Sequence, residues 1–271
     1  MPNAGKKRFY FIIVLILFFM VIGSVIFLFP LGSQPAQEPQ VPGQKTVQNS
    51  TAGVALTFDD DSVDQWFEIK DILKKYHVNA TFYVAHFNSL NASQINKLRI
   101  LQDQGNEIAF HGLEHRDAVE YLKDNSIDAY LNDEIISGLD LMKKAGFTPV
   151  DFSYPSGHGN NTLTERLRKY FLHIRLTASL KNGDGFYYEY GSNKTEIYGI
   201  GIDDITYDYS LDDIFKSISN AKENNKIIIF YAHIPVQNNP QMYQLSADRL
   251  EKILINASEN NMKFYKISEL K

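Results

Sequence analysis

The chain has 271 residues, of which 44% are hydrophobic and 22% are charged, and its formal net charge is −5. This composition fits one ordinary globular domain with an appendage, and the scattered lysines and arginines provide no basic surface for nucleic acid. The chain has no cysteine, which excludes disulfides, thiolate metal ligands and an acylated cysteine anchor. A metal site in this chain must therefore use histidines and carboxylates.

The N-terminal part of the sequence predicts a membrane anchor followed by a linker. Residues 1–8 are a short basic segment, and residues 9–29 are an uncharged apolar run long enough to cross a bilayer as one helix. A secretory signal has a shorter apolar centre and a small-residue cleavage site, so we expect an uncleaved, single-pass anchor with a cytoplasmic N-terminus. Residues 30–52 are rich in Pro and Gln, which predicts a linker. The domain that follows, residues 53–271, should then lie outside.

Strand and helix patterns alternate throughout residues 53–271. The strand candidates are Val54–Phe58, Ala80–Ala85, Glu107–Phe110, Val150–Ser153, Ile174–Thr177, Glu196–Ile202, Ile227–Ala232 and Lys263–Ile267. Amphipathic helices are predicted over Val63–Tyr76, Ser93–Gln104, Ile127–Lys144, Leu163–Tyr170, Leu211–Glu223 and Ala247–Asn260. This alternation is typical of an α/β fold with a parallel sheet and covering helices, either an open sheet or a barrel. In a barrel, the active residues gather at the carboxyl ends of the strands.

Three carboxylates follow the first predicted strand. Asp59, Asp60 and Asp61 are consecutive, so their charges repel one another unless a counter-ion is present. A divalent cation would take one carboxylate as an oxygen ligand and leave its neighbour free for proton transfer. The alternative interpretation is an acidic turn that caps the helix beginning near Ser62.

Histidines follow two further predicted strands. His111 and His115 come directly after Glu107–Phe110, and their spacing lets both bind one metal ion from a tight turn. With one carboxylate of the first strand they form a His₂-carboxylate set that leaves coordination positions open, which is typical of a catalytic site for zinc or a similar ion. His233 follows Ile227–Ala232 and is placed to act as a general acid. The alternatives are exposed polar histidines for the pair, and a hydrogen-bonded core or loop histidine for His233.

Four segments, in order along the chain, resemble the motifs of the polysaccharide deacetylases, also called the NodB-homology or carbohydrate esterase family 4 domain. They are Thr57-Phe58-Asp59-Asp60, His111-Gly112-Leu113-Glu114-His115, Phe152-Ser153-Tyr154-Pro155-Ser156-Gly157 and the stretch from Ile229 to His233. The resemblance spans nearly all of residues 53–271.

This resemblance implies a fold, a cofactor and a set of roles. The fold is a distorted (β/α)7 barrel, here preceded by the one transmembrane helix. One divalent metal ion, most commonly Zn²⁺ with Co²⁺ or another transition metal as alternatives, would be held by Asp60, His111 and His115. Asp59 would be the general base and His233 the general acid in the hydrolysis of an N-acetyl group.

The resemblance also indicates contacts with the substrate. Ser156 is expected to offer a backbone N–H to the oxyanion, and Tyr154 is a candidate wall of the carbohydrate site, although strand-rich domains also use tyrosine as a core residue. Either Asp203 or Asp204 could supply the carboxylate that supports His233.

Several positions depart from the pattern of the family. Asp61 stands where a small residue is usual, and Ser156 replaces an aromatic residue of a variant third motif. The third motif often has an arginine at the position of Ser153, and that arginine orients the base; the variant motif lacks it. Tyr231 stands at a position usually filled by leucine.

The sequence thus predicts a membrane-anchored, outward-facing, metal-dependent enzyme that removes N-acetyl groups from an extracellular or cell-envelope polysaccharide or oligosaccharide. Two alternatives remain open at this point. One is a metal-dependent hydrolase of a smaller amide or an ester on the same fold. The other is an inactive, glycan-binding deacetylase-like module.

Overall fold

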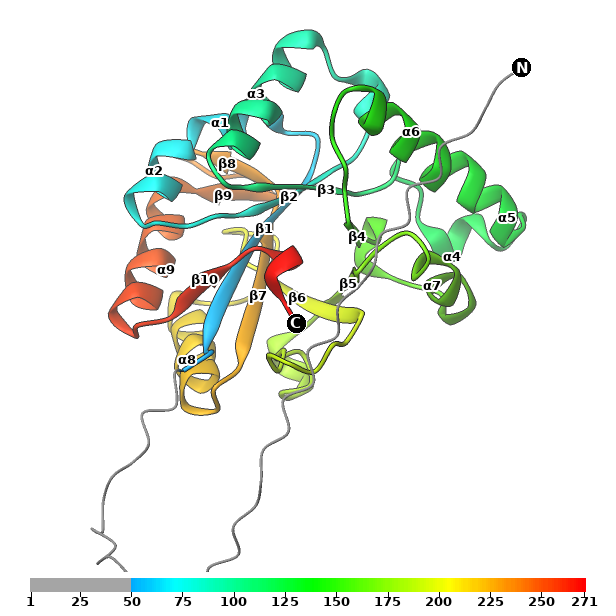
Figure 1. The fold of residues 1–271 in the computed structure, drawn as a ribbon. Coiled ribbons are helices and arrows are strands. Elements are labelled where there is room, and N and C mark those ends of the chain that lie inside the picture. Colours follow the sequence, from blue (N-terminus) through cyan, green and yellow to red (C-terminus); the bar gives the residue numbers. More distant parts are fainter. Residues whose placement is uncertain (1–49) are drawn as a thin grey trace, which may run out of the picture. The chain divides into compact units, whose positions relative to one another are not determined.

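The computed structural model describes residues 50–271 (Figure 1). Its strands are β1 (Gly53–Asp60), β2 (Thr81–Val84), β3 (Glu107–Phe110), β4 (Asp151–Ser153), β5 (His173–Ala178), β6 (Glu196–Gly201), β7 (Ile227–Ala232), β8 (Ile234–Val236), β9 (Gln244–Ser246) and β10 (Lys263–Tyr265). Its α-helices are α1 (Val63–Glu68), α2 (Lys70–Lys75), α3 (Ala92–Asp103), α4 (Ala118–Tyr121), α5 (Ile127–Tyr130), α6 (Ser137–Lys144), α7 (Asn161–Leu167), α8 (Leu211–Glu223) and α9 (Ala247–Glu259).

Strands β1 to β7 form a closed parallel barrel. Each strand pairs in parallel with the next along the chain, and β7 pairs back to β1 from Gly53 opposite Ile227 to Phe58 opposite Ala232. Strand β10 pairs with the first residues of β1, Gly53 to Ala55, and β2 pairs with its last residues, Thr57 to Asp60. Among the two alternatives left by the alternating pattern, the barrel is therefore confirmed.

The strands form because their side chains are buried on both faces. All six residues of β7, Ile-Ile-Ile-Phe-Tyr-Ala, are buried, as expected for a parallel strand enclosed by a barrel interior and an outer layer of helices. In β1, Leu56 and Phe58 pack with the outer helices, whereas Ala55 packs with an inner cluster that includes Ile229. Because successive side chains alternate between faces, Asp59 continues the inner series.

Two predicted helices are interrupted. The helix predicted over Val63–Tyr76 breaks at Ile69, whose backbone angles of φ −89° and ψ 1° end α1 and begin α2. The helix predicted over Ile127–Lys144 contains a π-helical segment, Leu131–Ile136, between α5 and α6. Strands β8 and β9, which pair only with each other among the described residues, were not predicted.

The amino-terminal ends of the strands carry a second polar layer inside the barrel. Thr81 and the backbone N–H of Ser268 both donate to Glu107 Oε2, and His173 pairs with the fully buried Asp151 through Nδ1 at 2.8 Å. Burial, together with the nearby Asp151 carboxyl, raises the pKa of Glu107 to about 8. This layer lies at the opposite end of the strands from the motif residues.

The predicted N-terminal segment, transmembrane anchor and most of the linker fall in residues 1–49, outside the described residues. Within residues 50–271, every helix is too short or too polar to cross a bilayer. Strand β1 begins at Gly53.

Candidate metal and catalytic site

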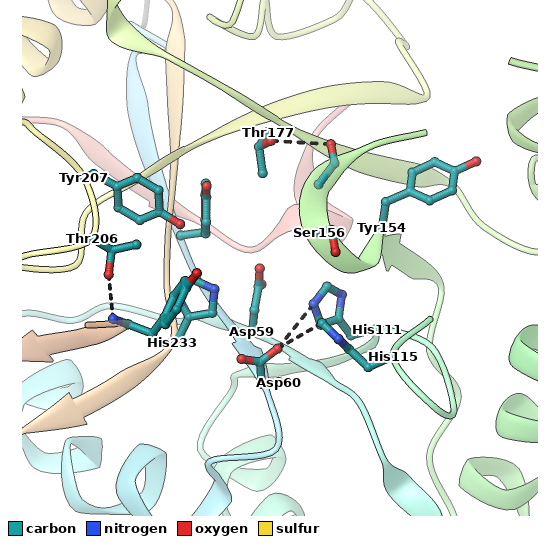
Figure 2. Close-up of a pocket in the computed structure, with 13 residues that line it drawn as sticks. Asp59, Asp60, His111, His115, Tyr154, Ser156, Thr177, Thr206, Tyr207 and His233 are labelled. Carbon is teal, nitrogen blue, oxygen red and sulfur yellow. Dashed lines mark hydrogen bonds and ion pairs between the residues drawn. The ribbon is translucent and has the colours of Figure 1, made fainter. Parts of the chain in front are cut away.

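A cavity of about 530 Å³ lies at the carboxyl ends of the barrel strands (Figure 2). Side chains from β1, from the loop after β3 and from the end of β7 converge on it, which is where a parallel barrel places its active residues. The residues that line it are Asp59, Asp60, His111, His115, Tyr154, Ser156, Gly157, Thr177, Thr206, Tyr207, Tyr231, His233 and Tyr243. Every residue predicted for the site is therefore at this cavity.

Asp60, His111 and His115 lie close enough to share one cation. Asp60 Oδ1 is 3.6 Å from His111 Nε2 and 3.2 Å from His115 Nε2, and the three ligand atoms all lie within 4.8 Å of one another (Figure 2). Asp60 has a φ of 86°, so the regular alternation of β1 ends there and its side chain joins Asp59 at the cavity. One carboxylate and two imidazoles are a donor set that suits zinc or a similar divalent ion.

The protonation states of His111 and Asp60 also fit a metal site. For His115, burial lowers the pKa but the Asp60 contact outweighs it, so the net shift is upward. His111 Nδ1 donates a hydrogen bond to the carbonyl of Ser153 at 2.9 Å, which leaves Nε2 as the free lone pair beside Asp60. Burial lowers the pKa of His111 to about 4, so its imidazole is neutral at neutral pH. Burial alone would raise the pKa of Asp60, but the His115 hydrogen bond and the neighbouring histidine charges hold it well below its usual range.

Asp59 is held by a buried arginine. Asp59 is 3% exposed, and its Oδ2 accepts a hydrogen bond from Arg175 Nη2, which also donates to Ser153 Oγ. The other oxygen, Oδ1, has no hydrogen-bond partner among residues 50–271. A carboxylate with one oxygen fixed and the other without a partner can accept a proton without losing its orientation.

Arg175 was missed by the sequence analysis. It lies on β5 directly opposite Ser153 of β4 in the parallel register, so its guanidinium comes from the strand next to the one where the family often has an arginine. Its Cζ lies 4.6 Å from the ring centre of Tyr231, and Arg175 is 1% exposed. The available signal was an arginine in the middle of the apolar segment Ile174–Thr177, because a buried arginine requires a charged or polar partner.

His233 is supported by Asp203, and not by Asp204. Asp203 Oδ2 lies 2.6 Å from His233 Nδ1, and Asp203 Oδ1 accepts the backbone N–H of His233 at 3.1 Å. Asp204 instead accepts from the backbone and hydroxyl of Ser246. Burial lowers the pKa of His233, but the Asp203 contact outweighs it, so the net shift is upward. With Nδ1 engaged by Asp203, Nε2 is the atom left for the cavity.

The third carboxylate of the first motif turns away from the site. Asp61 Oδ2 lies 3.1 Å from His86 Nδ1, and both side chains are partly exposed. Asp61 therefore has its own partner and does not compete with Asp59 for Arg175.

The two predicted substrate contacts of the third motif differ in placement. Ser156 is exposed, has a φ of 62° and lines the cavity. The ring of Tyr154 points away from the cavity (Figure 2), is fully buried, and its hydroxyl lies 2.9 Å from Thr164 Oγ1. Only the backbone of Tyr154 is therefore positioned at the site, as the core-residue alternative implies.

Aromatic side chains from other segments form a wall that the sequence analysis did not identify. The ring of Tyr243 packs edge-on against His233 with centroids 5.2 Å apart and is 49% exposed, while Tyr207 packs against Tyr231 at 5.5 Å. Tyr243 lies between β8 and β9, the strand pair that was not predicted, so no motif indicated its position.

Comparison with known proteins supports the fold and the family. The family model described as polysaccharide deacetylase matches residues 46–174. A family 4 acetyl xylan esterase from Clostridium thermocellum, solved with a cobalt ion, aligns with a TM-score of 0.52 and 21% identity over 80% of this chain and 88% of its own. The catalytic domain of a peptidoglycan N-acetylglucosamine deacetylase from Eubacterium rectale aligns with a TM-score of 0.54 and 16% identity over 84% of this chain and 94% of its own.

A pseudoenzyme of the same carbohydrate esterase family, from Bacillus anthracis, aligns with a TM-score of 0.54 and 15% identity over 82% of this chain and 66% of its own. At such low identities these likenesses show the fold alone. A comparison with curated protein sequences finds no significant match. The resemblance inferred from the four motifs is thus confirmed by the polysaccharide deacetylase family model over residues 46–174, and the closed parallel barrel agrees with it.

Proposed function

We propose that this chain is a metal-dependent deacetylase that hydrolyses N-acetyl groups of a polysaccharide or oligosaccharide. The observation that carries the proposal is the arrangement around one cavity: the Asp60, His111 and His115 donors lie beside Asp59, and His233 lines the same cavity. A candidate base, a candidate acid and an open metal-binding set are the parts that hydrolysis of an amide requires.

Asp60, His111 and His115 would hold the cation, for which we propose Zn²⁺. When bound, such an ion supplies Lewis-acid polarisation of the acyl carbonyl. The buried, neutral His111 and the low pKa of Asp60 mean that both ligands are in the deprotonated form that binding needs at neutral pH.

Asp59 and His233 would move the protons. Asp59 Oδ1 takes a proton from the attacking water as the new C–O bond forms at the acyl carbon. The backbone N–H of Ser156 would donate to the oxyanion. His233 Nε2 then donates its proton to the amide nitrogen as the C–N bond breaks, which releases acetate and a free amine. Asp203 favours this role because it stabilises the protonated form of His233.

The substrate class rests on the family and on the shape of the site. The cavity is open at the mouth and carries exposed Tyr243 at its rim, a side chain that can pack against a sugar ring. The names of the similar structures, a peptidoglycan N-acetylglucosamine deacetylase and an acetyl xylan esterase, point to acetylated glycans and to two linkages, an amide and an ester.

We also propose that residues 9–29 anchor the chain as one transmembrane helix, with the enzyme domain outside. The support is the uncharged apolar run after Lys6-Lys7-Arg8. Membrane fractionation of the full chain, followed by protease treatment of intact cells, tests it. Recovery in the soluble fraction, or protection of the domain from external protease, would contradict it.

The activity is tested by acetate release from N-acetylated oligosaccharides and from acetyl esters, with the full chain and its Asp59→Asn variant. The proposal expects release from the N-acetylated sugars and a loss of at least about 100-fold in the variant. Release from esters alone would favour the alternative substrate class. Glycan binding without any acetate release would favour the inactive module.

A further inference from the structure

The π-helical segment between α5 and α6 buries one carboxylate against the loop that carries the two histidines. We call residues 111–116 the histidine loop. Glu134 lies in the π-helical segment Leu131–Ile136 and is fully buried, whereas the side chain of its neighbour Asp133 is 51% exposed. A π-helical turn is a rare geometry that is frequent at functional sites, and a buried carboxylate is costly unless it is bound by donors.

All the donors around Glu134 come from the histidine loop. Glu134 Oε2 accepts the backbone N–H of Glu114 at 3.0 Å, and the backbone carbonyl of Glu134 accepts the N–H of Leu113 at 3.2 Å. Glu134 Oε1 lies 3.3 Å from Arg116 Nε, an ion pair without the alignment of a hydrogen bond. One side chain therefore contacts the middle and the end of the loop.

The histidine loop has a shape that it would not hold unaided. Gly112 has a φ of 87° and His115 a φ of 52°, so two of its residues are in left-handed conformations. For a residue other than glycine this conformation is unfavourable, because Cβ approaches the following carbonyl oxygen. A Cβ on Gly112 would lie 2.9 Å from Glu134 Oε2, so glycine at this position lets the carboxylate approach the backbone closely. The turn at His115 brings its Nε2 within 3.2 Å of Asp60.

We propose that Glu134 is a positioning residue for the metal site: its buried carboxylate holds the histidine loop in the conformation in which His115 joins His111 and Asp60 around one divalent cation. This inference rests on the proposed function only in requiring that these three residues bind a metal ion. The carboxylate of Glu134 does not contact the ligand atoms, so it acts through the backbone of Glu114 and through Arg116. Without it, His115 is free to leave the left-handed conformation, and the cation loses one of its ligands for part of the time.

The test is the affinity of the metal-free full chain for Zn²⁺, measured by isothermal titration, for the wild type, Glu134→Ala, Glu134→Gln and Asp140→Asn. Asp140 is an exposed acid on α6 and serves as the matched control. We expect Glu134→Ala to weaken Zn²⁺ binding roughly 10- to 100-fold, as is typical of residues that support metal ligands. Glu134→Gln keeps an acceptor for Glu114 but loses the charge opposite Arg116, so its loss should be smaller, and Asp140→Asn should match the wild type.

A second readout separates positioning from general stability. Acetate release by Glu134→Ala should recover toward the wild-type kcat when Zn²⁺ is raised to saturation. A lower melting temperature of the metal-free variants with an unchanged Zn²⁺ dissociation constant would overturn the inference, and would leave the proposed function standing. A wild type that binds no divalent cation would overturn both. If Glu134→Ala does not fold, the single variants Glu134→Gln and Arg116→Gln are measured in its place. Wild-type affinity for Zn²⁺ in both of them would overturn the inference.

Discussion

The guanidinium of Arg175, on β5, crosses the barrel interior to the carboxylate of Asp59, on β1. The same Nη2 also donates to the hydroxyl of Ser153, at the position where the family often carries its arginine. Ser153 and Arg175 are register partners on adjacent strands, so a side chain at either position starts from the same level of the barrel. In this chain the cation that holds Asp59, the proposed base, comes from β5, and Ser153 stands at the facing position of β4.

Replacement of Arg175 by methionine should abolish most activity and lower stability. The variant leaves Asp59 buried without its cation, which typically costs about 3–5 kcal/mol, and lets the base leave its orientation. Urea unfolding and kcat for acetate release measure the two effects. Arg168→Met, which removes only partly exposed ion pairs with Glu165 and Glu196, should change stability by less than about 1 kcal/mol.

A stricter test of the role of Arg175 transfers the arginine to the facing position on β4. The single variant Arg175→Ser should lose activity, and the double variant Ser153→Arg with Arg175→Ser should regain part of it, because a guanidinium again faces Asp59. Equal activity of the single and the double variant would show that orientation of Asp59 does not depend on this cation.

Asp203→Asn should move the alkaline limb of the pH profile of kcat to lower pH. Asp203 raises the pKa of His233 against the opposing effect of burial, so its removal lowers that pKa and shrinks the protonated fraction at neutral pH. The Asp204→Asn variant is the control, since Asp204 bonds to Ser246 instead. The assignment of His233 as the acid is wrong if the alkaline limb stays in place in Asp203→Asn.

Glu107→Gln should flatten the pH dependence of stability. The pKa of Glu107 is raised from 4.5 to about 8, so its stabilising contribution is complete below the unfolded value and is lost as the pH rises through about 8. The wild type should lose up to roughly 1.4 kcal/mol per pH unit from this group within that window. Urea unfolding at about pH 5.5 and about pH 8.5 measures the difference, with exposed Glu259→Gln as the control. Parallel stability curves for the wild type and Glu107→Gln would refute this account.

Gly157→Ala should lower the free energy of unfolding more than the same substitution at a left-handed glycine elsewhere in the chain. Gly157 has a φ of 73°, and a Cβ there would overlap the side chain of Thr177. Gly146 has a φ of 92° with nothing within 4 Å of its Cβ position, so Gly146→Ala should cost only the conformational penalty of about 1–2 kcal/mol. Adding Thr177→Ala to Gly157→Ala should recover part of the extra loss; no recovery would mean that the overlap is not its cause.

The sequence was most informative where pattern and chemistry coincide. The segments Glu107–Phe110 and Ile227–Ala232 were predicted to the residue. The second is a continuous apolar run, the first is an apolar run after one glutamate, and each is followed directly by a histidine. Asp59, Asp60, His111, His115 and His233 converge because carboxyl ends of parallel strands meet at one end of a barrel.

What the sequence could not supply depends on contacts between distant residues. Arg175 and Tyr231 face the interior by the two-residue alternation of their strands, but which side chain each meets follows from barrel closure. The ring of Tyr154 is a core side chain, and Tyr243 reaches His233 through a strand pair without a motif. The π-helical segment has the sequence pattern of an ordinary helix, and the contact of its buried carboxylate with the histidine loop joins residues 20 apart in the chain.

The most direct test of metal-dependent deacetylation is acetate release from an N-acetylglucosamine oligomer by the full chain as purified, after chelation, and after addition of Zn²⁺. The account predicts activity that chelation abolishes and Zn²⁺ restores in the wild type, and that Zn²⁺ does not restore in His115→Ala. Acetate release that persists after verified removal of the metal, or full activity in His115→Ala, would contradict it.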